Sequence, residues 1–254
     1  MNRKFLLLLI SIIVYKAGIS QQSYSDSVIQ KKIVLLKNLD GNHGSGTIIK
    51  YKDRFFLLSA HHVISVLTNE SEMLFRNAAG QVDSLKLKAV FPDPTKQSSH
   101  IEGDVEVLLL SPRNQNDIKL FELLSFDVNV VYKELTDIPR ELNVIVYGFP
   151  LYSLKNFEAM SYYSYLSSGL MDLPRADNKK TSWFYLLENP AMQGFSGGPV
   201  FISMSKQGMT PGPSQTFLIG VVHGTQYDNT GGKFAMITPS WYIANLLDSL
   251  KIDN

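Results

Sequence analysis

The sequence predicts an all-β protein, built as two barrels or a sandwich and closed by one helix. Short runs rich in β-branched and aromatic residues recur along the chain and are separated by turn residues. Near the end, apolar residues at Ile243, Leu246, Leu247 and Leu250 follow a helical spacing. Strands do not alternate with long helical segments, so a parallel α/β sheet is not expected.

The expected elements follow from this pattern, taken in order. In the first half we expect strand regions at residues 28–37, 47–51, 54–60, 72–76, 84–90 and 105–110. Residues 38–46 are rich in turn formers, residues 61–67 suit a short helix, and residues 91–103 and 111–117 suit polar connections. In the second half we expect strands at residues 143–147, 161–167, 183–187, 199–204, 217–223 and 233–237, followed by a helix at 240–250.

Composition narrows the class of protein. The chain has 254 residues and 44% hydrophobic content, which suits one large or two small packed domains. Its formal net charge of +1 argues against a nucleic-acid binder. It contains no cysteine, so it has no disulfide and no thiol nucleophile or thiolate metal ligand.

Residues 1–20 have the layout of a secretory signal peptide. A basic start at Arg3 and Lys4 precedes an apolar run over residues 5–14, and small residues follow up to Ser20. The run is too short to span a bilayer, although an uncleaved anchor is the alternative. We therefore expect a secreted or periplasmic protein, with cleavage near Ser20 and no stable membrane insertion afterwards.

The most informative stretch is residues 193–200, Gln-Gly-Phe-Ser-Gly-Gly-Pro-Val. Its glycines suit a sharp turn that presents backbone N–H groups to a ligand. Ser196, at the centre of that turn, is a candidate nucleophile. A serine hydroxyl is a weak nucleophile alone and needs a base and an orienting acid.

Candidates for both partners lie at the ends of apolar strands. His61 and His62 directly follow the apolar run 55–60, and Asp104 begins the apolar run 105–110. A desolvated carboxylate at such a place needs a partner, and an imidazole N–H can be one. Each residue alone also fits a structural role, a satisfied strand-end histidine or a loop-capping aspartate.

Together, residues 59–63 (Ser-Ala-His-His-Val), 104–108 (Asp-Val-Glu-Val-Leu) and 194–199 (Gly-Phe-Ser-Gly-Gly-Pro) resemble the trypsin/chymotrypsin-like serine proteases. The order His, Asp, Ser is that of the chymotrypsin type. The resemblance, which is strongest to the cysteine-free bacterial secreted branch, covers about residues 30–250. It implies two six-stranded-type antiparallel β-barrels, at 28–125 with the histidine and aspartate and at 126–254 with the serine and a C-terminal helix.

The same resemblance implies a serine endopeptidase that acts on protein or peptide substrates without metal or cofactor. Ser196 would be the nucleophile, His62 the base and Asp104 the orienting acid, with the N–H groups of Gly194 and Ser196 as oxyanion hole. The walls of the substrate pocket would be Pro190, Gln193, His223, Gly224 and Thr225. His223 resembles the pocket histidine of glutamyl endopeptidases, which makes acidic preference a hypothesis beside plain packing. Phe195 stands where zymogen-activated relatives have an aspartate, so no activating ion pair is expected there.

The sequence allows two alternatives to this interpretation. Residues 194–198 also satisfy the Gly-x-Ser-x-Gly motif of α/β-hydrolases, in which an acid and then a histidine follow the serine. Residues 197–222 contain no Asp or Glu before His223, so that interpretation is rejected. The other alternative is a weak or inactive protease-like fold that serves as a protein-binding module.

Overall fold

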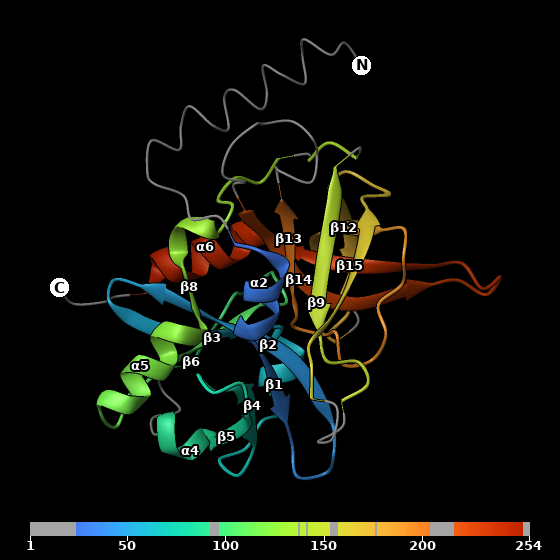
Figure 1. Cartoon of the computed structure of the whole chain (residues 1–254). Coiled ribbons are helices and arrows are strands. Elements are labelled where there is room, and N and C mark those ends of the chain that lie inside the picture. Colours follow the sequence, from blue (N-terminus) through green and yellow to red (C-terminus); the bar gives the residue numbers. More distant parts are fainter. Residues whose placement is uncertain are drawn as a thin grey trace.

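The computed structural model describes residues 24–91, 97–136, 138–140, 142–152, 157–175, 177–203 and 216–250. The predicted signal peptide lies outside these residues. Two antiparallel sheets, one from each half of the chain, make up most of the molecule (Figure 1). This confirms the expected all-β fold class with a C-terminal helix.

The first sheet contains eight strands. Its order is β5-β4-β1-β2-β3-β7-β6, and β8 pairs in parallel with β2. The strands are β1 (Ile33–Lys37), β2 (His43–Tyr51), β3 (Arg54–Ser59), β4 (Glu72–Arg76), β5 (Val82–Lys86), β6 (Gln97–Ser99), β7 (Glu106–Leu110) and β8 (Ser125–Asp127). The predicted hairpin of β2 and β3 is present, with its turn at Lys52 and Asp53.

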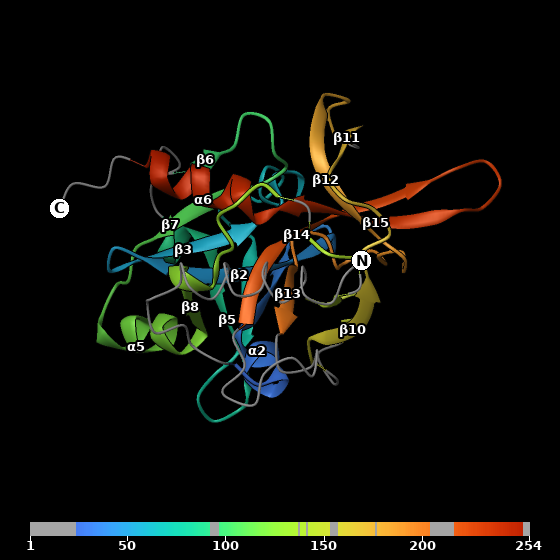
Figure 2. The same ribbon diagram turned by 90° about the horizontal axis from the view of Figure 1, so that it is seen from above.

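The second sheet contains seven strands in the order β10-β9-β13-β14-β15-β12-β11. They are β9 (Asn143–Gly148), β10 (Met160–Tyr165), β11 (Met171–Pro174), β12 (Thr181–Leu187), β13 (Pro199–Ser203), β14 (Thr216–Tyr227) and β15 (Lys233–Pro239). The outer part of the β14–β15 hairpin projects from the body of the molecule, as both views show (Figure 2).

Five α-helices and a 3₁₀ turn complete the described part of the chain. They are α2 (Asp26–Lys32), α3 (His61–Ile64), α4 (Leu87–Val90), α5 (Gln115–Leu124), the 3₁₀ turn η2 (Val128–Val130) and α6 (Ser240–Ser249). Although α6 follows the second sheet, it packs back toward the first, where the Tyr51 hydroxyl donates to Asp248 at 3.0 Å (Figure 1).

Several local predictions were wrong, and three of them concern residues 28–32, 43–46 and 87–90. Residues 28–32 are helical because α2 buries Ile29 in the core between the two sheets. Residues 87–90 form α4, which buries Leu87 and Val90, instead of continuing β5. Residues 43–46 belong to β2, where a Cβ at Gly46 would come within 3.0 Å of the Leu58 carbonyl oxygen, so the glycine lets the strand pass close to its neighbour.

The apolar core has three main parts. One cluster fills the first sheet and another fills the second. A third joins the two halves and α6, with members such as Leu35, Phe56, Tyr147, Phe201 and Ile243. This shared core fixes the two sheets relative to each other. The candidate site lies where they meet.

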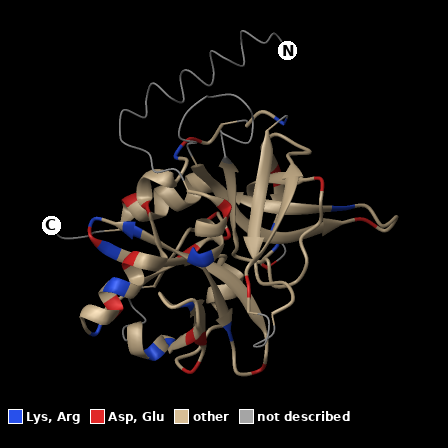
Figure 3. Ribbon diagram, viewed as in Figure 1, with Lys and Arg blue, Asp and Glu red and all other residues tan. Residues whose placement is uncertain are grey.

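Charge is spread thinly over the fold. In the view of Figure 3, basic and acidic residues are scattered among one another. Within the described residues, no helix has the length and apolar character needed to cross a bilayer.

Candidate active site

The loop that carries Ser196 lies between β12 and β13 and depends on glycine. Gly194 has φ +94° and Gly197 has φ +78°, a region that other residues enter only at a cost. A Cβ at Gly194 would come within 2.5 Å of the Phe149 carbonyl oxygen, and one at Gly197 would overlap Ser59 Oγ. The loop is therefore packed against both halves of the chain, the segment after β9 and the end of β3, and only glycine fits at both points.

Ser45 of β2 ties this loop to the first sheet. Its backbone N–H donates to the Ser196 carbonyl at 2.8 Å, and its hydroxyl donates to the Gly194 carbonyl at 2.7 Å. The same hydroxyl accepts from the Phe149 N–H at 2.9 Å. The sequence predicts turns over residues 38–46 and gives no sign that the buried Ser45 anchors the serine loop.

Two backbone N–H groups of the serine loop, those of Gly194 and Ser196, are available to a ligand. The N–H groups of Phe195, Gly197 and Gly198 all donate to backbone carbonyls. Among the described residues, those of Gly194 and Ser196 have no hydrogen-bond partner. Unpartnered N–H groups in a folded loop are uncommon and suit a ligand oxygen.

The side chain of Phe195, which stands between Gly194 and Ser196, is buried in the protein core. Its side chain is 1% exposed and belongs to the core of the second sheet, with its ring 5.1 Å from that of Tyr162 in an edge-to-face contact. The residue anchors the loop by burial, at the point where a zymogen-activated relative would place a charged aspartate.

His62 and Asp104 are brought together from separate elements. His62 stands in α3, directly after β3, and Asp104 precedes β7, the neighbour of β3 in the sheet. The His62 Nδ1 atom lies 2.7 Å from Asp104 Oδ2, and the His62 backbone N–H donates to Oδ1 at 3.1 Å. A carboxylate bonded to Nδ1 holds the ring in the tautomer whose Nε2 is free to accept a proton.

Asp104 has two further partners. One, Arg175, is not predicted from the sequence, and the other, His223, is predicted as a wall of the substrate pocket. Arg175, which follows β11 and is 2% exposed, reaches Oδ1 at 3.5 Å, and the imidazole of His223 in β14 bonds Oδ2. Burial alone would raise the pKa of Asp104, but the hydrogen bonds from His223 and His62 outweigh it and hold that pKa well below its usual range. Asp104 is therefore ionised at neutral pH.

Arg175 carries no signal in the sequence, because it follows a short strand and reaches Asp104 only through the fold. It is held in place by Asp177, whose carboxylate accepts from Nε at 2.9 Å, and by the Glu102 carbonyl at 2.9 Å. The second half of the chain thus supplies two of the groups that hold the carboxylate of the first half.

The neighbouring His61 forms a separate pair. Its Nδ1 lies 2.5 Å from Oε2 of Glu106, a fully buried side chain in β7. Burial raises the pKa of Glu106, and the hydrogen bond from His61 opposes that shift. Of the two adjacent histidines, only His62 lines the cavity that contains Ser196.

That cavity has a volume of about 350 Å³. Ser196, Gly194 and Gln193 line it from the second half of the chain. The first half contributes His62 and a mixed apolar and polar wall formed by Leu36, Asn38, Asp40, Asn42, His43, Gly44, Val63, Val66 and Leu67. A substrate bound here would touch both halves at once.

The five residues predicted as pocket walls come from the serine loop and from β14. Gln193 lines the cavity, Pro190 is exposed and Gly224 is half-buried. Thr225 donates from Oγ1 to the Ala191 carbonyl at 2.7 Å, which ties β14 to the serine loop. The His223 side chain is buried against Asp104, while its backbone carbonyl accepts a 3.5 Å hydrogen bond from Ser196 Oγ.

His62, Asp104 and His223 also form a group that could be considered for a metal ion, since their donor atoms lie within 4.8 Å of one another. Tetrahedral zinc with bonds near 2.0 Å would hold its ligand atoms roughly 3.3 Å apart. The 2.7 Å separation of His62 Nδ1 and Asp104 Oδ2 is instead that of a charge-assisted hydrogen bond. The geometry therefore suits shared protons better than a shared cation.

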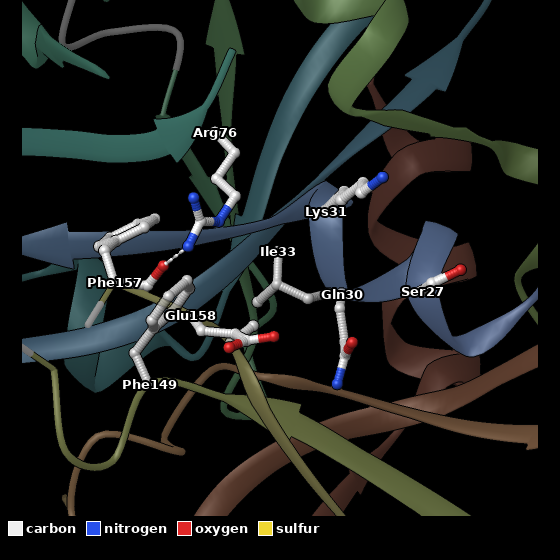
Figure 4. Close-up of a pocket in the computed structure, with 9 residues that line it drawn as sticks. Ser27, Gln30, Lys31, Ile33, Arg76, Phe149, Phe157 and Glu158 are labelled. Carbon is white, nitrogen blue, oxygen red and sulfur yellow. Dashed lines mark hydrogen bonds between the residues drawn. The ribbon is translucent and has the colours of Figure 1, made fainter. Parts of the chain in front are cut away.

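A smaller cavity of about 160 Å³ lies beside α2 (Figure 4). Phe149 and Phe157 line it, and the Arg76 guanidinium donates to the Phe157 carbonyl. Phe149 thus takes part both in this cavity and in the hydrogen bond to Ser45 that fixes the serine loop.

Comparisons with known proteins find solved structures of the same architecture. The MamO protease domain from Magnetospirillum magneticum matches with a TM-score of 0.57 and 13% identity, over 86% of this chain and 96% of that chain. The active form of the Rv3671c protease from M. tuberculosis matches with a TM-score of 0.58 and 15% identity, over 90% of this chain and 84% of that chain. The chain has the trypsin-like serine protease fold.

A third match, the HtrA-type protease AlgW with tripeptide, has a TM-score of 0.56 and 15% identity, and this chain aligns over 89% of its length with 63% of that chain. No family model matches the sequence, and no curated protein does. At these identities the likeness shows the trypsin-like fold alone.

Proposed function

We propose that the protein is a secreted serine endopeptidase that hydrolyses peptide bonds through an acyl-enzyme. The observation that carries this proposal is the His62–Asp104 hydrogen bond beside Ser196 in one cavity. The unpartnered N–H groups of Gly194 and Ser196 at the same cavity support it.

In the proposed reaction, Ser196 Oγ attacks the peptide carbonyl carbon while its proton passes to Nε2 of His62. The carbonyl oxygen becomes an oxyanion and accepts hydrogen bonds from the N–H groups of Gly194 and Ser196. Each such donor typically contributes about 10²–10³ in kcat. His62 then gives the proton to the leaving amine nitrogen as the C–N bond breaks, and water repeats the sequence to release the acid.

Asp104 stays ionised throughout this cycle. Its low pKa means that it accepts a hydrogen bond from Nδ1 of His62 and does not take the proton away. The negative charge stabilises the imidazolium that forms after Ser196 gives up its proton. Arg175 and the backbone N–H of His62 hold the other carboxylate oxygen in place.

The test is labelling with a fluorophosphonate probe, which reacts only with an activated serine. We expect the protein to be labelled at neutral pH and the Ser196→Ala variant not to be. Ser167, which lies outside the cavity lining, provides the matched control, since Ser167→Ala should be labelled as fast as the parent. Equal labelling of the Ser196→Ala variant and the parent would contradict the proposal.

One observation favours a second candidate function, that of a protein-binding module whose serine is not activated. The hydroxyl of Ser196 donates to the His223 carbonyl and not to His62. A folded protein that binds peptides but is neither labelled nor able to cleave them would support this function. Catalysis requires the hydroxyl to rotate toward His62 once substrate is bound.

Secretion is proposed from the layout of residues 1–20. The expected result is an exported protein whose first residue, determined by N-terminal sequencing, lies near Gln21. Retention of Met1 in the exported protein would argue for an uncleaved leader.

A further inference from the structure

We propose that His223 is a positioning residue of the active site, which holds the Asp104 carboxylate in place for His62. The inference rests on the proposed function, because positioning matters only if His62 acts as a base. Both imidazoles direct Nδ1 at the same oxygen, Oδ2 of Asp104. The two rings lie 5.5 Å apart and are nearly perpendicular, at 86°.

The fold aims the His223 side chain at this position. Val221, two residues earlier, packs in the core between the two sheets, and Val222 packs in the core of the second sheet. The register of β14 against β15 shifts between Val222 and Gly224, so that His223 occupies a β-bulge. A bulge redirects a side chain from the regular alternation of a strand, and here it turns the imidazole toward the first half of the chain.

Burial then fixes the ring. The His223 side chain is fully buried, and the Phe184 ring lies 5.0 Å from it at a tilt of 39°. A buried imidazole with one strong acceptor has little freedom to turn. Its backbone carbonyl is fixed as well and accepts from Ser196 Oγ. One residue thus contacts the acid through its side chain and the nucleophile through its backbone.

The charges around Asp104 decide which protons are present. The ionised carboxylate has no proton of its own, so both Nδ1 atoms must carry hydrogen to bond it. Arg175 faces Oδ1, and Asp177 pairs with Arg175 on its far side. The donor on His223 therefore shares the negative charge with His62, and it keeps Oδ2 in place while His62 gains and loses its proton.

The test compares two substitutions of nearly the same size. Asn places an N–H donor where Nδ1 stands in His223, whereas Leu places a methyl group there. We expect His223→Leu to lower kcat for a peptide substrate by about 10- to 100-fold, as for other residues that orient a catalytic group. KM should change little, and the acid limb of the pH–rate profile should move to higher pH, because Asp104 then shares its charge with one imidazole. His223→Asn should recover most of the lost kcat.

Two results would overturn the inference. One is wild-type kcat in the Leu variant. The other is equal loss in the Asn and Leu variants with an unchanged pH profile, which is the pattern of a packing role. Thermal unfolding of both variants confirms that they are folded.

A measurement without catalysis separates this inference from the proposed function. In the Ser196→Ala variant, side-chain NMR should show a low-field imidazole N–H proton from each of His62 and His223, beside the one that His61 directs at Glu106. The added His223→Asn change should remove one of these signals, and a spectrum that loses none would overturn the inference. Absence of fluorophosphonate labelling in the parent, with the His62 and His223 protons present, would contradict only the proposed function.

Discussion

Replacing Asp104 with Asn keeps the size of the side chain and changes which atoms can bond. In the structure, Oδ1 faces two donors, the His62 N–H and Arg175, and Oδ2 faces two imidazoles. An amide offers one oxygen and one NH₂ group. If the NH₂ group of Asn takes the place of Oδ1, it faces two other donors, the His62 backbone N–H and Arg175. If the NH₂ group takes the place of Oδ2, Nδ1 of His62 must become an acceptor. The proton of His62 then moves to Nε2, which can no longer accept one from Ser196.

The second arrangement is the more favourable, because it leaves Arg175 with an acceptor. We therefore expect kcat to fall by about 10⁴-fold, the effect of an imidazole held in the wrong tautomer. The free energy of unfolding should fall by about 1–3 kcal/mol, the cost of a poorly satisfied buried polar group. Arg175 keeps its contacts with Asp177, which limits this loss.

The assay is peptide hydrolysis at saturating substrate, combined with urea denaturation. Asp177→Asn provides the matched control, because Asp177 contacts Arg175 without touching His62. It should reduce stability while lowering kcat far less than Asp104→Asn. A kcat within tenfold of wild type in Asp104→Asn would refute the reasoning from tautomers.

Three other changes probe different parts of the account. In Gly197→Ala, the added Cβ overlaps the Ser59 side chain, and the residue must also keep a positive φ. The free energy of unfolding, measured by calorimetry, should fall by at least about 1–2 kcal/mol. An unchanged melting temperature would contradict the packing argument. The pKa of Glu106 is raised by burial against the pull of His61, so folding is favoured below that pKa and weakened as pH rises through it. Glu106→Gln should flatten the dependence of unfolding free energy on pH above about pH 4, the ordinary pKa of a glutamate, whereas an unaltered slope would show that another group titrates there. Among the described residues that line the main cavity, Asp40 alone carries a carboxylate. Asp40→Asn should therefore lower the preference for Arg or Lys directly after the scissile bond by roughly two- to fivefold in a peptide library. An unchanged preference would show that the leaving segment of the substrate does not contact Asp40.

The sequence predicts those features whose signal lies in the neighbouring residues. The strand ends that carry His62 and Asp104 follow from apolar runs, and the turn at Ser196 follows from its glycines. α6 follows from helical spacing after Pro239. In each case the signal lies within a few residues of the position it predicts.

Other features carry no such signal or were not recognised. The first turn of α5 was predicted to lie in a polar connection, although the Asn114 side chain caps the helix by accepting from the N–H groups of Asn116 and Asp117. That cap could have been found. The contacts of Asp104 with Arg175 and His223 join residues that are 71 and 119 positions apart, so only the packing of the two halves reveals them.

The central claim is that Ser196 is activated by His62, and pre-steady-state kinetics with a nitrophenyl ester test it most directly. An acyl-enzyme predicts a burst of nitrophenol equal to the enzyme concentration, absent in Ser196→Ala and strongly slowed in His62→Ala. A folded wild-type protein that gives no burst, or a His62→Ala variant that gives a burst at the parent rate, would contradict the account.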